Sequence, residues 1–317
     1  MTNPIDNILP RDTEDGVSKI LHSFSETIDE FVNFGTHVLK WHVDIKRGGD
    51  EQMPLIMFLR ELLEKADSIS ILVKNSSIDP AKTILRSLFE LHLYISYLLE
   101  SHFQDRSMAF LVWNAKNIIK TNNAFLKGNQ EYKNLKRQVE NDNSFLDIND
   151  LDRLPSATPI IDNQEALLQR PEYKKALTEY EKTKKRFGNP KWYSLFNGPQ
   201  SIQGLAIHLK MSSFYELVYR NWSGSVHSTD IINGKIVKSQ NANEVSDKIS
   251  ADIIQIRLPK DAQSVSAFTL VLMIKTYSTL INTKIPDKKV EYTKWYLSVR
   301  NRMSKVTSKE QLIKIEY

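Results

Sequence analysis

The chain of 317 residues contains no cysteine. This absence excludes disulfides, thiolate nucleophiles, zinc sites with cysteine ligands and iron–sulfur clusters. Turn residues are also scarce, with 10 glycines and 11 prolines. Because β-sandwiches, propellers and dinucleotide-binding folds use more of them, the composition favours a mainly helical fold. The length suffices to bury one large core or two modest ones without a stabilising metal.

Long hydrophobic runs are missing as well. The first 16 residues are polar and lack the apolar stretch of a signal peptide. The longest uncharged apolar run, Ala262–Ile274, has 13 residues, whereas a helix needs about 20 to span a bilayer. We therefore expect a cytoplasmic protein that does not associate with a membrane.

Charge is distributed unevenly, although the net charge is only +5. Residues 170–192 contain eight Lys or Arg against three Glu, and residues 284–317 contain nine against four acidic residues. Two basic segments on an otherwise acidic chain suit a polyanion such as RNA, and Lys182, Lys184, Lys185 and Arg186 are the candidate contacts. The alternative is that both segments are ordinary solvated helices.

Apolar spacing predicts helices over most of the chain, beginning with residues 17–41. From Leu55 to Val73 apolar residues recur at alternating intervals of four and three, which is typical of an amphipathic helix. The next helix, from Asp79-Pro80 to Glu100, is apolar nearly all round and should be central. Further helices are expected over 106–126, 171–187, 201–211, from Ser213, over 262–281 and in the C-terminal tail. Residues 141–171 are rich in Asn, Asp and Pro and predict a long connection.

Beyond His227 the pattern changes to short β segments. Asn233-Gly234 lies between apolar residues, as in a hairpin, and residues 253–258 resemble a strand. The predicted architecture is a helical bundle with a small β insertion after His227. Its divisions are a helical lead (1–50), a helical core (51–283) containing the 141–190 insertion and the 228–260 β region, and a basic helical tail (284–317).

Arg86 and Glu90 are four residues apart in the central helix and share a face with apolar neighbours. We interpret them as an ion pair that points inward or into a cleft. Arg before Glu is the less favourable order for supporting the helix itself. Two roles remain open: a structural pair that ties helices together, or a pair that orients a site residue.

A second set of polar residues lies at 219–227, in the sequence Tyr-Arg-Asn-Trp-Ser-Gly-Ser-Val-His. Seven residues of α-helix make almost two full turns, so Arg220 and His227 would lie on one face about 10 Å apart. Arg can bind a phosphate through two hydrogen bonds and His can transfer a proton, a combination suited to phosphodiester chemistry. The alternative is a histidine satisfied within the core.

These two segments together resemble a largely prokaryotic group, the domain-of-unknown-function 5677 family. Its members pair an Arg-x-x-x-Glu helix, matched by Arg86 and Glu90, with a later Tyr-Arg-x-x-Ser-x-x-Val-His segment, matched by residues 219–227. Residues 203–206, which lead into Tyr215, fit as well. The resemblance covers roughly residues 56–280.

More distantly, Arg220 and His227 resemble the Arg-x4–6-His pattern of HEPN-superfamily ribonucleases, at the upper limit of its spacing. Asn221 matches the polar residue that often follows the arginine of that pattern. The resemblance implies a helical bundle that forms a homodimer, in which two motifs build one composite site. It also implies metal-independent RNA cleavage without a cofactor, often in phage defence or beside an antitoxin partner.

The resemblance assigns roles to individual residues. His227 would act as general base on the ribose 2′-hydroxyl or as acid on the leaving oxygen, and Arg220 would stabilise the pentavalent phosphate. Asn221 would hydrogen-bond a phosphate or His227. The supporting residues would be Arg86 and Glu90, which orient the site, Ser223, which adds a hydroxyl donor, and Tyr219.

Other motifs are missing. The sequence has no Glu-x-x-His of di-iron bundles, no His-Glu-x-x-His and no glycine-rich phosphate loop. The remaining histidines show no ligand spacing, so we expect no metal. Besides RNA cleavage, two functions remain open: a non-catalytic helical interaction module, and a sensor of a small ligand or nucleotide.

Overall fold

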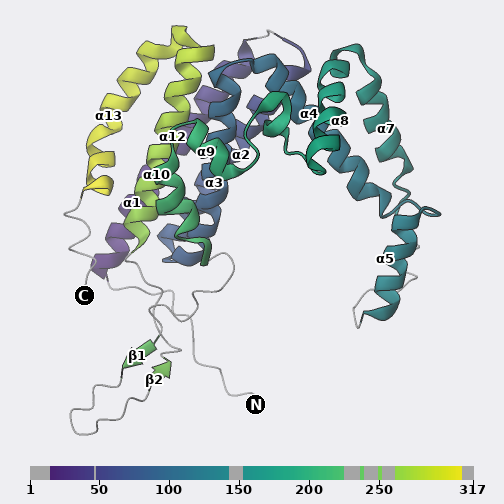
Figure 1. Ribbon diagram of the computed structural model, residues 1–317. Coiled ribbons are helices and arrows are strands. Elements are labelled where there is room, and N and C mark those ends of the chain that lie inside the picture. Colours follow the sequence, from purple (N-terminus) through teal and green to yellow (C-terminus); the bar gives the residue numbers. More distant parts are fainter. Residues whose placement is uncertain are drawn as a thin grey trace. The chain divides into compact units, whose positions relative to one another are not determined.

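The computed structural model describes residues 15–45, 48–142, 153–224, 236–238, 249–251 and 261–308. Within these ranges the chain is mainly helical, with eleven α-helices (Figure 1). The α-helices are α1 (Asp15–Asp44), α2 (Met53–Lys74), α3 (Ile78–Glu100), α4 (Phe103–Asn123), α5 (Gln130–Asn141), α7 (Thr158–Gln169), α8 (Lys174–Phe187), α9 (Ile202–His208), α10 (Ser212–Phe214), α12 (Ala262–Lys284) and α13 (Lys289–Thr307). The mainly helical fold predicted from composition is confirmed.

Shorter elements connect these helices. Four are 3-10 helices: η1 (Asp50–Gln52), η2 (Pro171–Tyr173), η3 (Trp192–Asn197) and η6 (Pro286–Lys288). Residues Tyr215–Arg220, labelled η4, form a π-helix. Strands β1 (Ile236–Lys238) and β2 (Ile249–Ala251) pair in antiparallel fashion, with Val237 opposite Ser250. The hairpin turn predicted at Asn233-Gly234 and the strand predicted over 253–258 lie outside the described residues.

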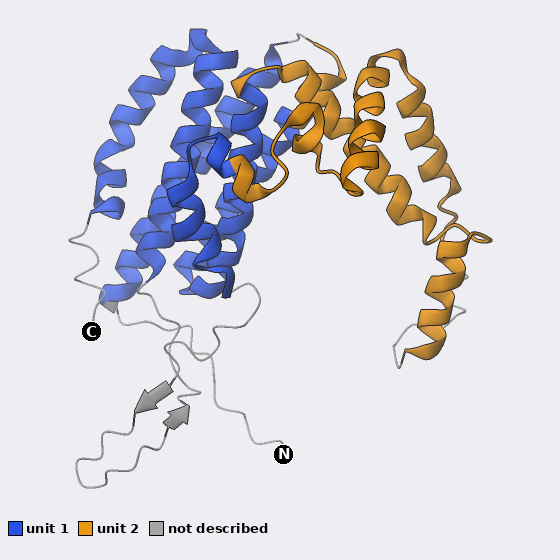
Figure 2. Ribbon diagram, viewed as in Figure 1, with its two compact units in different colours: residues 1–47, 55–99, 206–317 blue, residues 48–54, 100–205 orange. Residues whose placement is uncertain are grey.

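The chain forms two compact units (Figure 2). Unit 1 comprises Met1–Arg47, Leu55–Leu99 and Ala206–Tyr317, and unit 2 comprises Gly48–Pro54 and Glu100–Leu205. The N-terminal helix α1 and the C-terminal helix α13 both belong to unit 1, where they pack against α12. The domain boundaries placed at residues 50 and 283 stay a prediction.

Unit 1 is built on helices whose apolar stripes face inward. The stripe predicted in α2 is buried along its whole length, at Leu55, Leu59, Leu62, Ala66, Ile69 and Val73. Helix α3 is the central helix expected from its apolar composition, since 13 of its 23 residues are buried. One buried polar contact joins it to α12: His92 Nδ1 lies 2.8 Å from Thr276 Oγ1.

Aromatic packing holds α1, α12 and α13 together. Phe34 of α1 stacks on Trp295 of α13 with ring centroids 3.8 Å apart. Tyr277 of α12 donates its hydroxyl proton to the Phe31 carbonyl oxygen at 2.9 Å. Gly35 leaves room for this contact, because a Cβ at that position would overlap the Tyr277 hydroxyl and a Leu63 methyl group.

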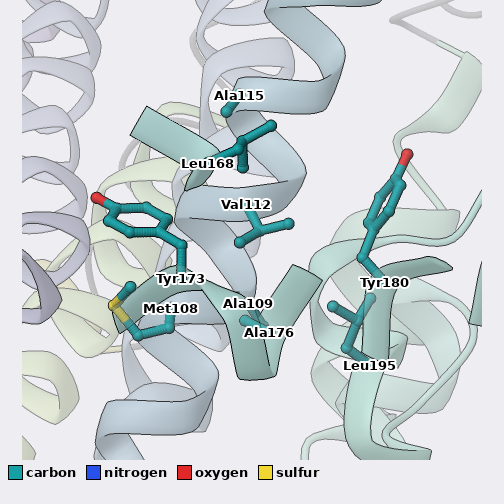
Figure 3. Packing of buried hydrophobic residues seen from close by; sticks show 9 residues of the cluster. All are labelled: Met108, Ala109, Val112, Ala115, Leu168, Tyr173, Ala176, Tyr180 and Leu195. Carbon is teal, nitrogen blue, oxygen red and sulfur yellow. The ribbon is translucent and has the colours of Figure 1, made fainter. Parts of the chain in front are cut away.

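Unit 2 has its own hydrophobic core around α4 (Figure 3). Met108, Ala109, Val112 and Ala115 form one apolar side of α4, with the regular three- and four-residue spacing of a helix stripe. The residues packed against it come from α7, η2, α8 and η3: Leu168, Tyr173, Ala176, Tyr180 and Leu195. The predicted basic helix over 171–187 is confirmed as η2 followed by α8, which ends at Gly188 with a φ of 78°.

The long connection predicted over residues 141–171 is wrong, because α7 occupies Thr158–Gln169. Pro159 lies in its first turn, where a missing backbone N–H costs nothing, and Ile161 and Leu168 are buried. Pro159 therefore lies at the start of a helix and does not mark a connection.

Helix α12 has the length and apolar composition of a membrane-spanning helix. About half of its most apolar 18-residue window, 56%, is buried inside the structure. Its neighbours there are α1 and α13. A core helix meets the same criteria of length and composition. Because α12 packs against α1 and α13, we interpret it as a core helix of unit 1.

Candidate functional site

Arg86 and Glu90 of α3, and the described part of the 219–227 motif, all lie in unit 1. There, residues 208–222 run alongside α3. His208 contacts Tyr97 near the C-terminal end of α3, with ring centroids 5.7 Å apart. Phe214 stacks on Phe89 in the middle of the helix at 5.0 Å. These contacts move toward the start of α3 as the segment advances, so the two run antiparallel.

Trp222 ends this series at the beginning of α3, where the Lys82 ammonium lies 5.8 Å from its ring. Lys82 is almost completely buried and forms ion pairs with Asp79 and with Asp261, just before α12. These hydrogen-bonded carboxylates raise the pKa of Lys82 against the opposing effect of burial. The first turns of α3 and α12 and the end of the segment therefore meet at one fixed cation.

The segment itself contains the π-helix η4. Ser213 and Glu216 predict a capping box, but the structure shows no side-chain cap there: α10 begins at Ser212 and passes directly into η4. The Asn221 N–H donates to the Glu216 carbonyl oxygen at 3.1 Å, five residues back. Such turns are rare and occur frequently at functional sites. Arg220 thus ends a π-helix, whereas its spacing from His227 predicted an α-helix through both residues.

Tyr219 connects η4 to the Arg86 and Glu90 pair of α3. Its hydroxyl donates to Glu90 Oε1 at 2.7 Å, and the guanidinium carbon of Arg86 lies 4.2 Å from the centre of its ring. Burial, followed by the hydrogen bond to Glu90, raises the pKa of Tyr219 to about 12. Tyr219 is therefore a proton donor in a hydrogen bond and remains neutral at physiological pH.

Arg86 and Glu90 make contact through Tyr219, and no direct ion pair between the two is present in the described residues. The second Glu90 oxygen, Oε2, accepts a hydrogen bond from Tyr94 at 3.1 Å. The Nε of Arg86 is buried and has no hydrogen-bond partner in the described part of the chain. The inward orientation expected for Arg86 and Glu90 is therefore present, with a tyrosine as the link between them.

Arg220 projects into solvent at the end of η4, with 70% of its side chain exposed. Its guanidinium donates to Glu216 at 3.1 Å, an exposed pair four residues apart. Exposed pairs of this kind contribute little to stability, about 0.3–0.5 kcal/mol. A phosphate could replace Glu216 at small cost, so Arg220 is accessible to an anionic ligand.

The rest of the motif continues beyond Arg220. Asn221 is exposed in a turn, and Ser223 is half-buried. His227 lies outside the described residues. The structure thus brings Tyr219, Arg86 and Glu90 together and leaves the proposed contact between Arg220 and His227 a prediction.

Sequence reasoning missed three residues of this site: Glu216, Tyr94 and Lys82. The spacing of the first two carried a signal. Glu216 precedes Arg220 by four residues, the favourable order on a helix, and Tyr94 follows Glu90 by four. Lys82 follows Asp79 by three residues, which is also a helical spacing, but its second partner, Asp261, is 179 positions later in the chain and carries no such signal.

The four candidate RNA-binding cations lie on α8 in unit 2. Lys182, Lys184, Lys185 and Arg186 are all exposed. Lys182 approaches Glu179 at 3.3 Å. Trp192, which flanks this segment, is buried in the core of unit 2 instead of being available to stack on a base. No cluster of three His, Asp or Glu side chains suited to a metal occurs among the residues that the structure describes.

Comparison with known proteins gives one match. A family of unknown function (DUF5677) matches residues 52–244, which is more than half of the chain and spans α3, η4 and β1. Neither the curated proteins nor the solved structures contain a match. Arg86, Glu90, Tyr219 and Arg220 all lie within the matched range, and the chain belongs to the DUF5677 family.

Proposed function

We propose that this protein is a metal-independent RNA-cleaving effector of a prokaryotic defence or toxin system. Its helical core would be HEPN-like, with the region after His227 inserted as a small β element, and it would act in the cytoplasm as a homodimer. The observation that carries the proposal is the placement of Arg220: an exposed guanidinium at the end of a π-helix that Tyr219 ties to Glu90.

The chemistry follows from the residue types. His227 would remove the proton from a ribose 2′-hydroxyl, whose oxygen attacks the adjacent phosphorus, and a protonated His227 would return a proton to the departing 5′-oxygen. The products would be a 2′,3′-cyclic phosphate and a free 5′-hydroxyl. In a homodimer the two imidazoles can take these two roles. Arg220 would neutralise the extra charge on the pentavalent phosphate through paired hydrogen bonds, with Asn221 and Ser223 as additional donors.

The scaffold beneath Arg220 would act through position. Tyr219 is held at two points on α3, since it donates to Glu90 and its ring lies against Arg86, and Tyr94 of the same helix donates to the other Glu90 oxygen. Productive geometry demands such support, because a displacement of about 1 Å can cost 100-fold in rate. Arg86 and Glu90 are thus positioning residues in this proposal.

Incubation of the purified full-length protein with total RNA or tRNA in the presence of a chelator tests the proposal. Cleavage that leaves 2′,3′-cyclic phosphate ends is expected for the wild type and should be lost in His227→Ala and in Arg220→Ala. Arg60→Ala is the matched control, because Arg60 is an exposed arginine paired with Glu64 four residues away at 3.3 Å. Full activity in His227→Ala, or loss of activity in Arg60→Ala, would contradict the proposal.

A non-catalytic interaction module is the second candidate. The contacts that favour it are those among Glu90, Tyr219 and Arg86, which tie η4 to α3 within unit 1 without a ligand. In that case no RNA is cleaved, and Glu90→Gln lowers the melting temperature with no other effect. The RNA incubation above separates the two functions.

A further inference from the structure

The exposed side of α8 carries two adjacent hollows, both within unit 2. The larger has a volume of about 710 Å³ and lies over Leu177, Thr178, Glu181 and Lys185. The smaller has a volume of about 340 Å³ and includes Thr183, Phe187, Ser194, Asn197 and Gln200. Lys182 and Arg186 line both hollows and form the ridge between them.

The surrounding chain neutralises only part of the positive charge on this side of α8. Lys185 and Arg186 form no ion pair with the described residues, and Lys182 approaches Glu179 at 3.3 Å. Glu181, the other acidic neighbour, pairs with Lys116 of α4 at 2.9 Å. A cation at the C-terminal end of a helix is favoured by the helix dipole alone, so charge by itself does not define a site. Lys184 illustrates this, because it lines neither hollow.

One carboxylate, Glu179, lies in the wall of the smaller hollow, and its oxygens are occupied. Oε1 accepts from the Phe196 N–H and from the Thr183 hydroxyl, both at 3.3 Å, and Oε2 faces Lys182. Only 14% of this side chain is exposed. Glu179 therefore serves the attachment of η3 to α8, and its charge is compensated before any ligand binds.

The smaller hollow offers groups that suit a nucleobase. Asn197, held in the left-handed region with a φ of 61°, and Gln200 present exposed side-chain amides, which carry both donors and acceptors. The half-exposed ring of Phe187 lies beside them, with the Arg186 guanidinium 4.8 Å from its centre. Unpaired bases are read by this combination of amide hydrogen bonds and stacking on aromatic or guanidinium planes.

We propose that this surface binds single-stranded RNA. Successive phosphates lie along Lys182, Lys185 and Arg186, and one base enters the smaller hollow between Phe187 and the amides of Asn197 and Gln200. The choice of RNA rests on the proposed function, whereas the phosphate and base contacts are read from α8 and η3. A single strand is required, because a base within a duplex is paired through its Watson–Crick edge and stacked on both faces, so it cannot enter the hollow.

Fluorescence anisotropy with a labelled, unstructured 20-nucleotide RNA tests this proposal, using the full-length chain with His227→Ala to prevent cleavage. The variant Lys182→Gln/Lys185→Gln/Arg186→Gln should bind at least tenfold more weakly. The slope of log affinity against log salt should also become shallower by up to about 2, since each phosphate contact contributes about 0.7 on a single strand. The matched control, Lys133→Gln/Lys174→Gln/Lys191→Gln, removes equal charge from exposed positions of the same unit outside both hollows and should change affinity less than threefold.

The base contact has its own test. Phe187→Ala should weaken RNA binding at least fivefold, because stacking of a base on an aromatic ring is a large contribution, and it should leave the binding of inorganic polyphosphate unchanged. Equal losses in the two triple variants, or polyphosphate competing as well as unlabelled RNA, would show a general charge effect and overturn the proposal. The proposal would also be overturned if binding to phosphatidylserine vesicles depended on Lys182, Lys185 and Arg186 and RNA binding did not.

Failure of this proposal is distinguishable from failure of RNA cleavage. Binding that depends on the ridge but comes with no cleavage product in the wild type overturns the catalytic proposal alone. Cleavage that survives in the ridge variant with unaltered RNA affinity overturns this proposal alone. Thermal melting of each variant by circular dichroism verifies that the chain is folded.

Discussion

The Tyr219 hydroxyl donates a hydrogen bond of 2.7 Å to Glu90, 129 residues earlier in the sequence. This contact fixes the end of η4 on α3, and Arg220 follows it directly. Tyr219 has a second attachment through its ring, which Arg86 and Tyr215 both contact, at 4.2 Å and 5.1 Å. The hydroxyl and the ring can therefore be tested separately.

Replacing Tyr219 with Phe removes the hydrogen bond and keeps the ring. Because a hydrogen bond to a charged group contributes about 1.5–3 kcal/mol and Glu90 retains Tyr94, we expect the free energy of unfolding to fall by about 1–2 kcal/mol. Urea denaturation measures this change. Tyr296→Phe is the matched control: Tyr296 stacks on Tyr292, and its hydroxyl has no described partner, so a change below about 0.5 kcal/mol is expected. Equal effects in both variants would contradict the assigned role of the hydroxyl.

Gly35→Ala should destabilise unit 1 sterically. The added methyl group would overlap the Tyr277 hydroxyl and a Leu63 methyl group in the contact between α1, α12 and α2. Overpacking of this kind costs about 1–3 kcal/mol, which thermal denaturation would detect. Gly16→Ala on the same helix meets no atom within 4 Å and should be neutral or slightly stabilising, because alanine is the better helix former. A stable Gly35→Ala variant would show that α1 and α12 can move apart at little cost.

Stability should depend on pH through His92. Complete burial, followed by the nearby charge of Lys275, lowers the pKa of this imidazole to about 3 in the folded state, from about 6.5 when unfolded. The unfolded chain therefore binds the proton more tightly. His92 contributes full stability above pH 6.5, and this stability is lost as the pH falls toward 3, by about 1.4 kcal/mol per unit.

Chemical denaturation between pH 7 and pH 4 checks the contribution of His92. His92→Leu should have a shallower loss of stability with falling pH than the wild type, whereas His22→Gln, at an exposed position on α1, should not. Thr276 remains satisfied in the first variant, because its hydroxyl donates to the Leu272 carbonyl oxygen at 2.8 Å. Identical slopes for His92→Leu and the wild type would refute this assignment.

Lys82→Met should destabilise the junction of α3 and α12. The substitution leaves Asp79 and Asp261 without their shared cation, but both aspartates are partly exposed and can be hydrated. We therefore expect a loss of about 1–2 kcal/mol, below the 3–5 kcal/mol seen when a fully buried pair is broken. In a double-mutant cycle with Asp261→Asn, measured by urea denaturation, the combined loss should be smaller than the sum. Strict additivity would show that the pair carries no coupling.

Helix positions followed from apolar spacing, because that signal is local. The stripe from Leu55 to Val73 and the all-apolar α3 are buried as their patterns predict. Helix α7 was missed because Pro159 and the polar residues before it were interpreted as breakers, although Pro in a first turn is compatible with a helix. The pattern of turn residues alone does not distinguish these two situations.

The candidate site was predictable in part. Arg86, Glu90 and Tyr219 were singled out from their spacing and family resemblance, and the structure brings these three together. The π-helix was not predictable, because a local change from i→i+4 to i→i+5 backbone hydrogen bonds leaves no mark in residue spacing. The contact of Lys82 with Asp261 depends on how α3 and α12 meet, which only the tertiary structure determines.

The antiparallel run of residues 208–222 along α3 has a consequence for how variation in this family can be interpreted. Its aromatic contacts fix the register of the segment on α3, because a shift of one residue would misplace Phe214, Tyr219 and Trp222 simultaneously. An insertion or deletion between His208 and Trp222 is therefore tolerated only where a compensating change preserves the contacts of all three residues with α3. Homologues whose segment differs in length should carry matching alterations in α3.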